Sequence, residues 1–120
     1  MIVSKMNYWI IPAITKIENR YTDLAVKNAI REVLGIPVKA LESHNRQRHL
    51  VVGRQIFCYL MREHTSVSYK FIGDCLDGRD HATIIHNIRK LKETLEVEKF
   101  QNSTETLDII NKVQNYLIIT

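Results

Sequence analysis

A run of polar and basic side chains between residues 77 and 90 is the part of this sequence best suited to recognise a ligand. The run reads Asp77-Gly78-Arg79-Asp80-His81-Ala82-Thr83-Ile84-Ile85-His86-Asn87-Ile88-Arg89-Lys90. It combines a glycine-containing turn with polar residues at a helix start and an apolar stripe behind them. A DNA-reading helix needs these features, because its polar N-terminal end reaches base edges and its apolar back packs on a scaffold. The pattern predicts such a helix from Asp80 onward.

The first residues of this helix carry groups that base recognition uses. Asp80 can accept a hydrogen bond from a cytosine amino group, and His81 and Thr83 can donate or accept at base edges. The methyl group of Ala82 can contact a thymine methyl. The basic residues that can bind phosphates are Arg46, Arg48, Arg54, Arg89, Lys90 and Lys92.

Other chemistries have little support in the sequence. His81 and His86 are five residues apart, which puts them about 140° apart around a helix, so they do not share a face for a metal ion. None of the four glycines belongs to a G-x-x-x-x-G-K-[ST] phosphate-binding loop. No carboxylate cluster or activated nucleophile suggests an enzyme. We therefore expect no catalysis, no nucleotide binding, no cofactor and no metal.

The elements that would position the reading helix are also helical. Gly and Pro are scarce, at four and two residues, and no clear period-2 run occurs, so we expect a mostly helical fold. A helix over residues 68–76, the turn at 77–79 and a helix over about 80–97 would form a helix-turn-helix. This motif places the second helix against DNA.

Four other helical segments should complete the domain. Three are expected over residues 22–34, 38–41 and 49–63. Asn102 and Glu105 have the spacing of a capping box, so a last helix should begin at Asn102. The apolar stripes should form the core, with Leu24, Phe71 and Leu107 among the inward residues.

The charges of the chain are unevenly distributed. The 120 residues carry a net charge of +4. From His44 to Arg62 the charged side chains are all basic, whereas the segment from Glu93 to Asp108 holds five acids and one lysine. Positive potential is thus concentrated on one part of the surface, as a polyanionic partner requires.

The cysteines and the hydropathy of the chain indicate the cellular compartment in which the protein is expected. Cys58 and Cys75 have apolar neighbours at helical spacing, so we expect buried free thiols, which fits a reducing cytoplasm. No run of about 18 apolar residues occurs, so we expect no membrane span. Residues 1–11 are apolar but interrupted by Ser4, Lys5 and Asn7, and they do not resemble a signal peptide.

Residues 1–20 should be an arm or an extra helix that packs on a domain formed by residues 21–120. The alternative is a segment that binds a protein partner, because an exposed apolar patch often marks such a site.

The stretch from about Leu24 to Leu117 resembles the C-terminal DNA-binding domain (domain IV) of the bacterial replication initiator DnaA. The signature of that family reads G-G-R-D-H-T-T-V-L-H-A and aligns with residues 77–87. Further matching residues are Arg54-Gln55 and Ser68…Ile72-Gly73. The resemblance implies an all-α, Trp-repressor-like helical bundle with a helix-turn-helix and double-stranded DNA as its partner.

The resemblance also implies roles for individual residues. Asp80, His81 and Ala82 would read bases in the major groove, and Thr83 would contact a phosphate. Arg46 would enter the minor groove. The DNA backbone would be contacted by Arg54, Gln55, Ser68, Tyr69 and Lys70. The complete set expected at DNA is Arg46, Arg48, Arg54, Gln55, Ser68, Tyr69, Lys70, Arg79, Asp80, His81, Ala82, Thr83 and Lys90.

Two departures from the family pattern should alter recognition. Ala82 replaces the usual Thr, which keeps a methyl group but loses the hydroxyl, so we expect a shifted sequence preference. His44 and Asn45 occupy positions that are often basic in the family, so we expect weaker and more pH-sensitive phosphate contacts there.

The sequence thus predicts a protein that binds DnaA-box-like sites and regulates replication initiation or transcription, without ATPase activity and in the bacterial cytoplasm at the nucleoid. The alternative is a protein-interaction module on a DnaA-like fold that uses the apolar N-terminal arm.

Overall fold

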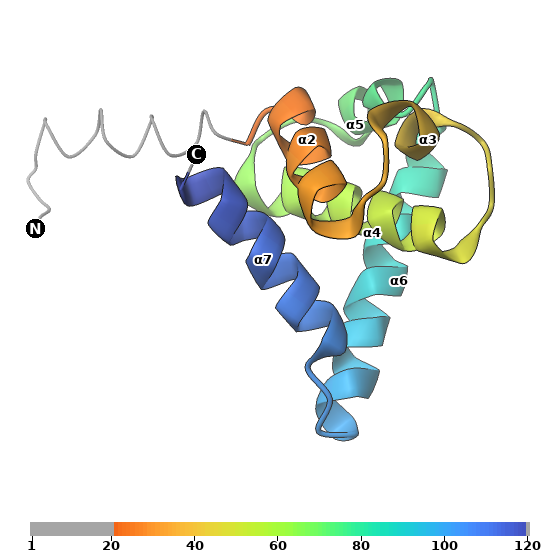
Figure 1. Cartoon of the computed structure of the whole chain (residues 1–120). Coiled ribbons are helices and arrows are strands. Elements are labelled where there is room, and N and C mark those ends of the chain that lie inside the picture. The colour runs from red at the N-terminus through yellow and green to blue at the C-terminus, as the bar shows by residue number, and fades with distance from the viewer. Residues whose placement is uncertain (1–20, 120) are drawn as a thin grey trace, which may run out of the picture.

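The computed structural model describes residues 21–119 as six helices, α2 to α7, with no strand among them (Figure 1). The helices are α2 Asp23–Leu34, α3 Val38–Glu42, α4 Arg48–His64, α5 Tyr69–Cys75, α6 His81–Phe100 and α7 Glu105–Ile119. The expected all-α fold with a helix-turn-helix, here α5 and α6, is confirmed. The arm or partner-binding segment expected at residues 1–20 lies outside the described residues.

Short polar side chains begin two of the helices, as the sequence predicts. The Thr22 hydroxyl accepts a hydrogen bond from the Ala25 N–H at 3.2 Å, and the Ser68 hydroxyl accepts from the Phe71 N–H at 3.1 Å. At the other end of α2, Gly35 adopts a left-handed conformation with a φ of 71°. These local signals explain why the predicted bounds of α2 and α5 agree with the structure to within a residue.

The predicted capping box at Asn102 is wrong. Asn102 has a φ of 59° and ends α6 instead of beginning α7. The next residue, Ser103, donates its N–H to the Glu98 carbonyl at 2.7 Å, the pattern of a Schellman motif. The Glu98 side chain then accepts from the Thr106 N–H at 2.8 Å, which joins the end of α6 to the first turn of α7. Left-handed Asn is a common helix terminator, and the sequence spacing alone does not distinguish that role from an N-cap.

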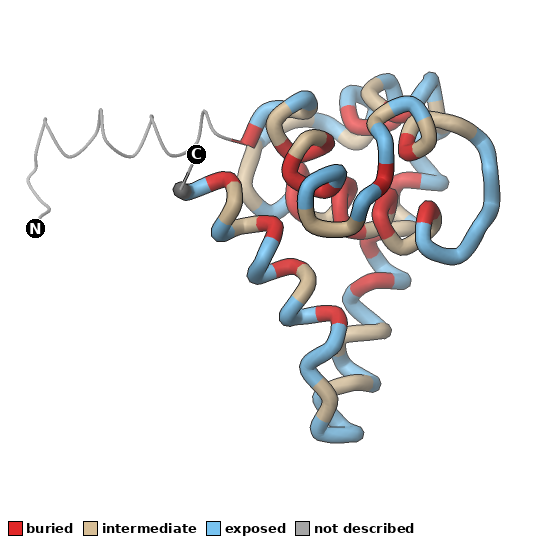
Figure 2. The backbone as a smooth tube through the Cα atoms, in the orientation of Figure 1, coloured by how far each residue is buried: buried red, intermediate tan, exposed pale blue. Residues whose placement is uncertain are grey.

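The hydrophobic core surrounds α4. Figure 2 shows most of the buried residues on α4 and on the helix faces turned toward it. The fully buried residues Phe57, Leu60 and Met61 of α4 share this core with Ile30 of α2 and Ile84 of α6. Helices α2 and α6 both pack on α4, α5 packs on α6, and α7 packs on α2. Helix α6 is therefore held by the centre of the domain, while its far end extends with α7 away from the body (Figure 1).

Three residues expected in the core are exposed. Leu24 is 58% exposed, and Phe71 and Leu107 are each 45% exposed. Leu24 and Phe71 lie about 140° around their helices from the mean direction of the buried residues, and Leu107 lies about 90° away. Each of these helices buries one narrow face, so apolar residues outside that face meet solvent.

The cysteines only partly follow expectation. Both are free thiols; Cys58 is buried, but Cys75 is only half-buried. Burial raises the pKa of the Cys58 thiol to about 12 and that of the Cys75 thiol to about 11. Within residues 21–119, no helix combines the length and apolarity needed to cross a bilayer. The same part of the chain brings together no group of three potential metal ligands from His, Cys, Asp and Glu.

Candidate nucleic-acid interface

The turn between α5 and α6 is closed by main-chain contacts. Asp77 and Gly78 are both left-handed, with φ values of 62° and 74°. The Arg79 N–H donates to the Gly73 carbonyl at 2.9 Å, and a Cβ atom on Gly73 would lie 2.0 Å from the Arg79 carbonyl oxygen. Gly73 is therefore needed for the close approach that sets the direction of α6.

The start of α6 presents polar groups to solvent. Asp80 occupies the N-cap position, but its side chain makes no capping hydrogen bond. Its carboxylate lies 3.2 Å from His81 Nδ1, and the two side chains are 68% and 65% exposed. Ala82 and Thr83 are exposed as well, whereas Ile84 behind them is buried. The start of α6 therefore combines exposed polar side chains with a buried apolar face, as the sequence predicts.

The start of α5 lies beside the start of α6. One surface hollow is lined by Ser68, Tyr69, Lys70, Asp74, Gly78, Arg79, Asp80 and His81. Ser68 uses its hydroxyl to cap α5, and Tyr69 packs its ring under the Arg62 guanidinium at 4.2 Å. Lys70 is exposed, and its Nζ lies 3.3 Å from Asp74. The fold thus brings together two groups of predicted site residues that are about ten positions apart in sequence.

The basic loop between α3 and α4 is compact. The Asn45 side-chain oxygen accepts from the Gln47 N–H at 2.9 Å, and the Ser43 hydroxyl accepts from the Asn45 N–H at 3.3 Å. Arg46 and Arg48 are both exposed. These short-range bonds order the loop main chain, while Arg46 in the loop and Arg48 at the start of α4 face solvent.

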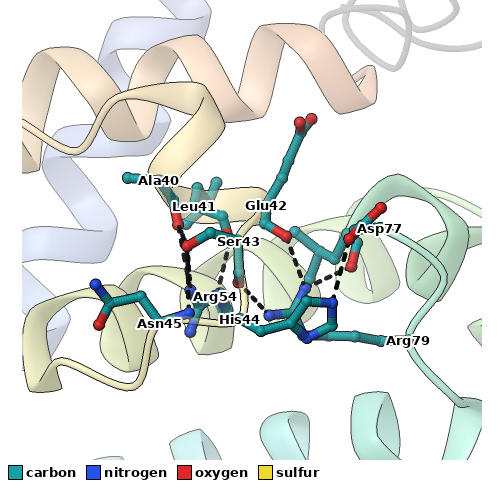
Figure 3. Close-up of polar contacts among 10 residues, drawn as sticks. Ala40, Leu41, Glu42, Ser43, His44, Asn45, Arg54, Asp77 and Arg79 are labelled. Atoms are coloured by element: carbon teal, nitrogen blue, oxygen red, sulfur yellow. Dashed lines mark hydrogen bonds and ion pairs between the residues drawn. The ribbon is translucent and has the colours of Figure 1, made fainter.

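Arg54 lies inside the protein rather than on its surface. It is 5% exposed, and its Nε donates to the Leu41 carbonyl at 2.7 Å. Its Nη2 donates to the Ala40 carbonyl at 3.2 Å and to the Ser43 hydroxyl at 3.4 Å (Figure 3). Burial, together with the nearby charge of Arg79, lowers the pKa of Arg54. Its hydrogen bonds are directed at α3 and the loop that follows, and its neighbour Gln55 is half-buried.

Arg79 connects the α5–α6 turn to the same loop. Its Nη1 donates to the Glu42 carbonyl at 3.2 Å and to the Leu76 carbonyl, and its Nη2 donates to the Ser43 carbonyl (Figure 3). A second link lies at the surface, where His44 Nε2 is 3.2 Å from Asp77 Oδ2. The turn that precedes α6 and the basic loop are therefore one connected unit.

Lys27 is a supporting residue that sequence reasoning missed. It is 4% exposed, and its Nζ donates to Glu42 Oε2 at 2.6 Å and to the Cys75 carbonyl at 2.5 Å. The ammonium also lies 5.5 Å from the centre of the Phe57 ring. These contacts join α2, α3 and the end of α5. Glu42 and Cys75 are 15 and 48 residues away in sequence, so no local pattern marks the lysine as buried.

Lys90 lies apart from the polar start of α6. It is exposed, and its Nζ is 4.0 Å from a Glu93 oxygen. Nine residues of helix separate it from His81, or about 13 Å along the helix axis. A phosphate contact by Lys90 would therefore be made at some distance from any base contact by His81.

Comparison with known proteins identifies similar domains. The family model described as "Bacterial dnaA protein helix-turn-helix" matches residues 25–91. The chromosomal replication initiator protein DnaA of Chloroflexus aggregans is 38% identical over 90 residues, which cover 75% of this chain and 19% of that protein. The protein of the same name from Geobacter sp. (strain M21) is 39% identical over 83 residues, which cover 68% of this chain and 18% of that protein.

A third relative with this name, from Trichormus variabilis, is 34% identical over 83 residues, which cover 69% of this chain and 18% of that protein. The chain thus spans about a fifth of the length of the curated relatives it matches. No solved structure gives a significant match.

Proposed function

Since the chain belongs to the bacterial DnaA helix-turn-helix family, we propose that it binds double-stranded DNA in a sequence-specific manner, at sites like those that DnaA proteins recognise. The observation that carries the proposal is the start of α6, where Asp80, His81, Ala82 and Thr83 are exposed on a helix whose back is buried in the core. This is the arrangement of a recognition helix.

In the proposed complex, the N-terminal end of α6 enters the major groove, which is about 12 Å wide and admits a helix. Asp80, His81 and Ala82 would face base edges, and Thr83 would bond a phosphate. The hollow shared with α5 would then lie along the sugar–phosphate backbone, with Lys70 as its exposed cation.

The basic loop would contact the DNA at a second place. Arg46 would enter the neighbouring minor groove, where a guanidinium is attracted by the negative potential. Arg48, at the first position of α4, and Lys90, farther along α6, would bind phosphates. Arg54 and Arg79 would support this surface from behind, because their hydrogen bonds go to the protein main chain and to Ser43.

We infer a regulatory role for this binding, at sites that control replication initiation or transcription. A domain that occupies such a site competes with any other protein that reads the same bases. Regulation would then follow from occupancy, and we predict that it requires no ATP hydrolysis.

A second candidate function is that of a protein-interaction module. The N-terminal arm to which this idea first applied lies outside the described residues. At the far end of the α6–α7 hairpin, however, Val97 and Phe100 are 54% and 91% exposed, and Leu107 in the first turn of α7 is 45% exposed. Exposed large apolar side chains favour a protein contact at this end of the hairpin, which is the opposite end of α6 from its polar start.

Fluorescence anisotropy with a DnaA-box duplex and a scrambled duplex tests the DNA-binding proposal. We expect tighter binding to the box, and both affinities should fall steeply between about 50 and 200 mM salt because phosphate contacts release counterions. Equal, salt-dependent binding to both duplexes would mean that the target differs from the standard box, and selection from random sequence would identify it. An absence of binding to either duplex would reject DNA recognition in favour of the interaction module.

A further inference from the structure

We propose that Arg79 is a positioning residue that couples the two parts of the DNA-binding surface. One part is the basic loop of residues 43–47, which carries Arg46, and the other is the start of α6, which carries His81. The inference deepens the proposed function and rests on it for its consequence at DNA. Its structural basis, however, is visible in the protein alone.

The side chain of Arg79 joins segments that are far apart in sequence. Its guanidinium donates to the main-chain carbonyls of Glu42 and Ser43, which lie 37 and 36 residues earlier, and to that of Leu76 in its own turn. A guanidinium holds its five N–H donors in a rigid planar fork, so bonds to several carbonyls fix both the distance and the orientation of the segments that carry them. An ammonium or a neutral amide cannot reproduce this geometry.

The main chain of Arg79 is equally constrained. Its N–H donates to the Gly73 carbonyl at 2.9 Å, and its own carbonyl oxygen occupies the space of a Cβ atom on Gly73. His81 follows only two residues later, at the first position of α6. Arg79 therefore has its main chain in the helix-turn-helix and its guanidinium on the basic loop.

Neither of the other contacts of the loop can replace this link. Arg54 bonds the Ser43 hydroxyl and the carbonyls of α3, but it belongs to α4 and does not reach the turn. The pair of His44 and Asp77 does join the loop to the turn, but both side chains are more than two thirds exposed, and exposed ion pairs contribute little. Lys27 bridges Glu42 and the Cys75 carbonyl from α2, but its printed bonds reach neither the loop main chain nor residues 77–79. The part-buried link between the loop and the turn is that of Arg79.

This coupling has a consequence for binding. Arg46 and His81 can contact one DNA molecule together only if their separation matches that of the adjacent grooves. When the loop is held in place, little conformational entropy is lost as Arg46 binds, whereas an untethered loop must be ordered at that moment. Arg46 should therefore contribute to affinity only while Arg79 holds its loop.

A double-mutant cycle on the full chain tests this dependence. We expect Arg46→Ala to weaken box binding about tenfold or more in the parent protein but less than about threefold in the Arg79→Gln variant. The matched control is Arg62→Gln, which removes a guanidinium that donates to the Val67 carbonyl and packs on Tyr69 without touching the loop. In that background, the effect of Arg46→Ala should be as large as in the parent.

Two other results would overturn the proposal. If the Arg46 and Arg79 effects are additive and Arg79→Gln also lowers the salt dependence, Arg79 contacts a phosphate directly. If they are additive with an unchanged salt dependence, Arg79 acts only on overall stability. The Arg79→Lys variant serves if Arg79→Gln does not fold. Lysine keeps the positive charge but lacks the planar fork of donors. The coupling to Arg46 should therefore be lost in Arg79→Lys, whereas a direct contact between residue 79 and a DNA phosphate would be retained.

Amide hydrogen exchange of the DNA-free protein separates failure of this proposal from failure of the proposed function. We expect faster exchange over residues 43–49 in the Arg79→Gln variant, with α2 and α7 unchanged. If the parent protein does not distinguish the box from a scrambled duplex, the proposed function fails, but this exchange result still tests the coupling. Unchanged exchange in the loop would refute the coupling itself.

Discussion

Arg54 and Arg79 donate hydrogen bonds to two different oxygens of the same residue, Ser43. Arg54 reaches the hydroxyl at 3.4 Å from α4, and Arg79 reaches the main-chain carbonyl from the turn before α6. The two like charges are tolerated near each other because carbonyl oxygens of α3 and the turn surround them. Two of the arginines that were expected at DNA thus bond the protein itself, whereas Arg46 and Arg48 are exposed.

Replacing His81 tests the reading helix. We expect His81→Ala to reduce the ratio of box to scrambled affinity by about tenfold, because one base-edge contact is worth roughly 1–3 kcal/mol. His86→Ala is the matched control, since His86 is also exposed on α6 but lies five residues farther along, about 140° around the helix from His81. Anisotropy titrations with both duplexes measure the ratio. An unchanged ratio in His81→Ala would show that α6 is wrongly assigned as the reading helix.

Lys90 should contribute affinity without specificity. We expect Lys90→Ala to weaken binding to box and scrambled duplexes alike and to reduce the salt slope by about one unit. Lys112 is exposed on α7, a helix that packs mainly on α2 and holds none of the residues proposed at DNA, so Lys112→Ala should leave both affinities nearly unchanged. Titrations over a range of salt concentrations provide the slope. A selective loss of box binding in Lys90→Ala would contradict a phosphate role.

Ala82 should set the preference at one base pair. Ala82→Thr restores the hydroxyl found in the family signature, and the residue is exposed, so the larger side chain can be accommodated without repacking. We expect the substitution to move the selected sequence toward the standard DnaA box, with a change of about 1–3 kcal/mol at the affected position. Selection from a random duplex library with each protein compares the two preferences. Identical selected sequences would place Ala82 outside the base-reading set.

Gly73 should be the most demanding glycine of the helix-turn-helix. A Cβ atom there would lie 2.0 Å from the Arg79 carbonyl oxygen, and main chain cannot yield as a side-chain end can. We expect Gly73→Ala to lower the free energy of unfolding by roughly 3 kcal/mol. Gly78→Ala is the control, because Gly78 has a φ of 74° but open space around it, and it should cost only about 1 kcal/mol. Urea denaturation gives both values, and equal losses would argue against the close approach.

The buried thiol should make the domain sensitive to alkali. Burial raises the pKa of Cys58 from 9.0 to about 12 in the folded protein. A raised folded-state pKa gives a contribution to stability that is complete below pH 9 and is lost as the pH rises toward 12, because the unfolded thiol ionises first. Cys58→Ala should therefore show a shallower decline of unfolding free energy between pH 9 and pH 11 than the parent. Parallel declines would mean that other groups dominate alkaline unfolding.

Local signals explain which elements were predictable. The caps at Thr22 and Ser68, the left-handed Gly35 and the 3.6-residue apolar period act over three or four positions, so they can be recognised in a linear sequence. The error at Asn102 has the same origin. Its local spacing fits two different roles, and the choice between them depended on where α7 packs.

The amino-acid sequence by itself determined the helical class, most helix bounds and the order of polar groups along the start of α6. These properties depend on backbone propensity and on neighbours within one helical turn. The tertiary structure decided which cations face solvent. Lys27, Arg54 and Arg79 each donate to a carbonyl oxygen that is 13 to 48 residues away in sequence, whereas Arg46 is left exposed. Such partners come within hydrogen-bonding distance only after the helices have packed, because a buried charge is stable only where the fold supplies its acceptors.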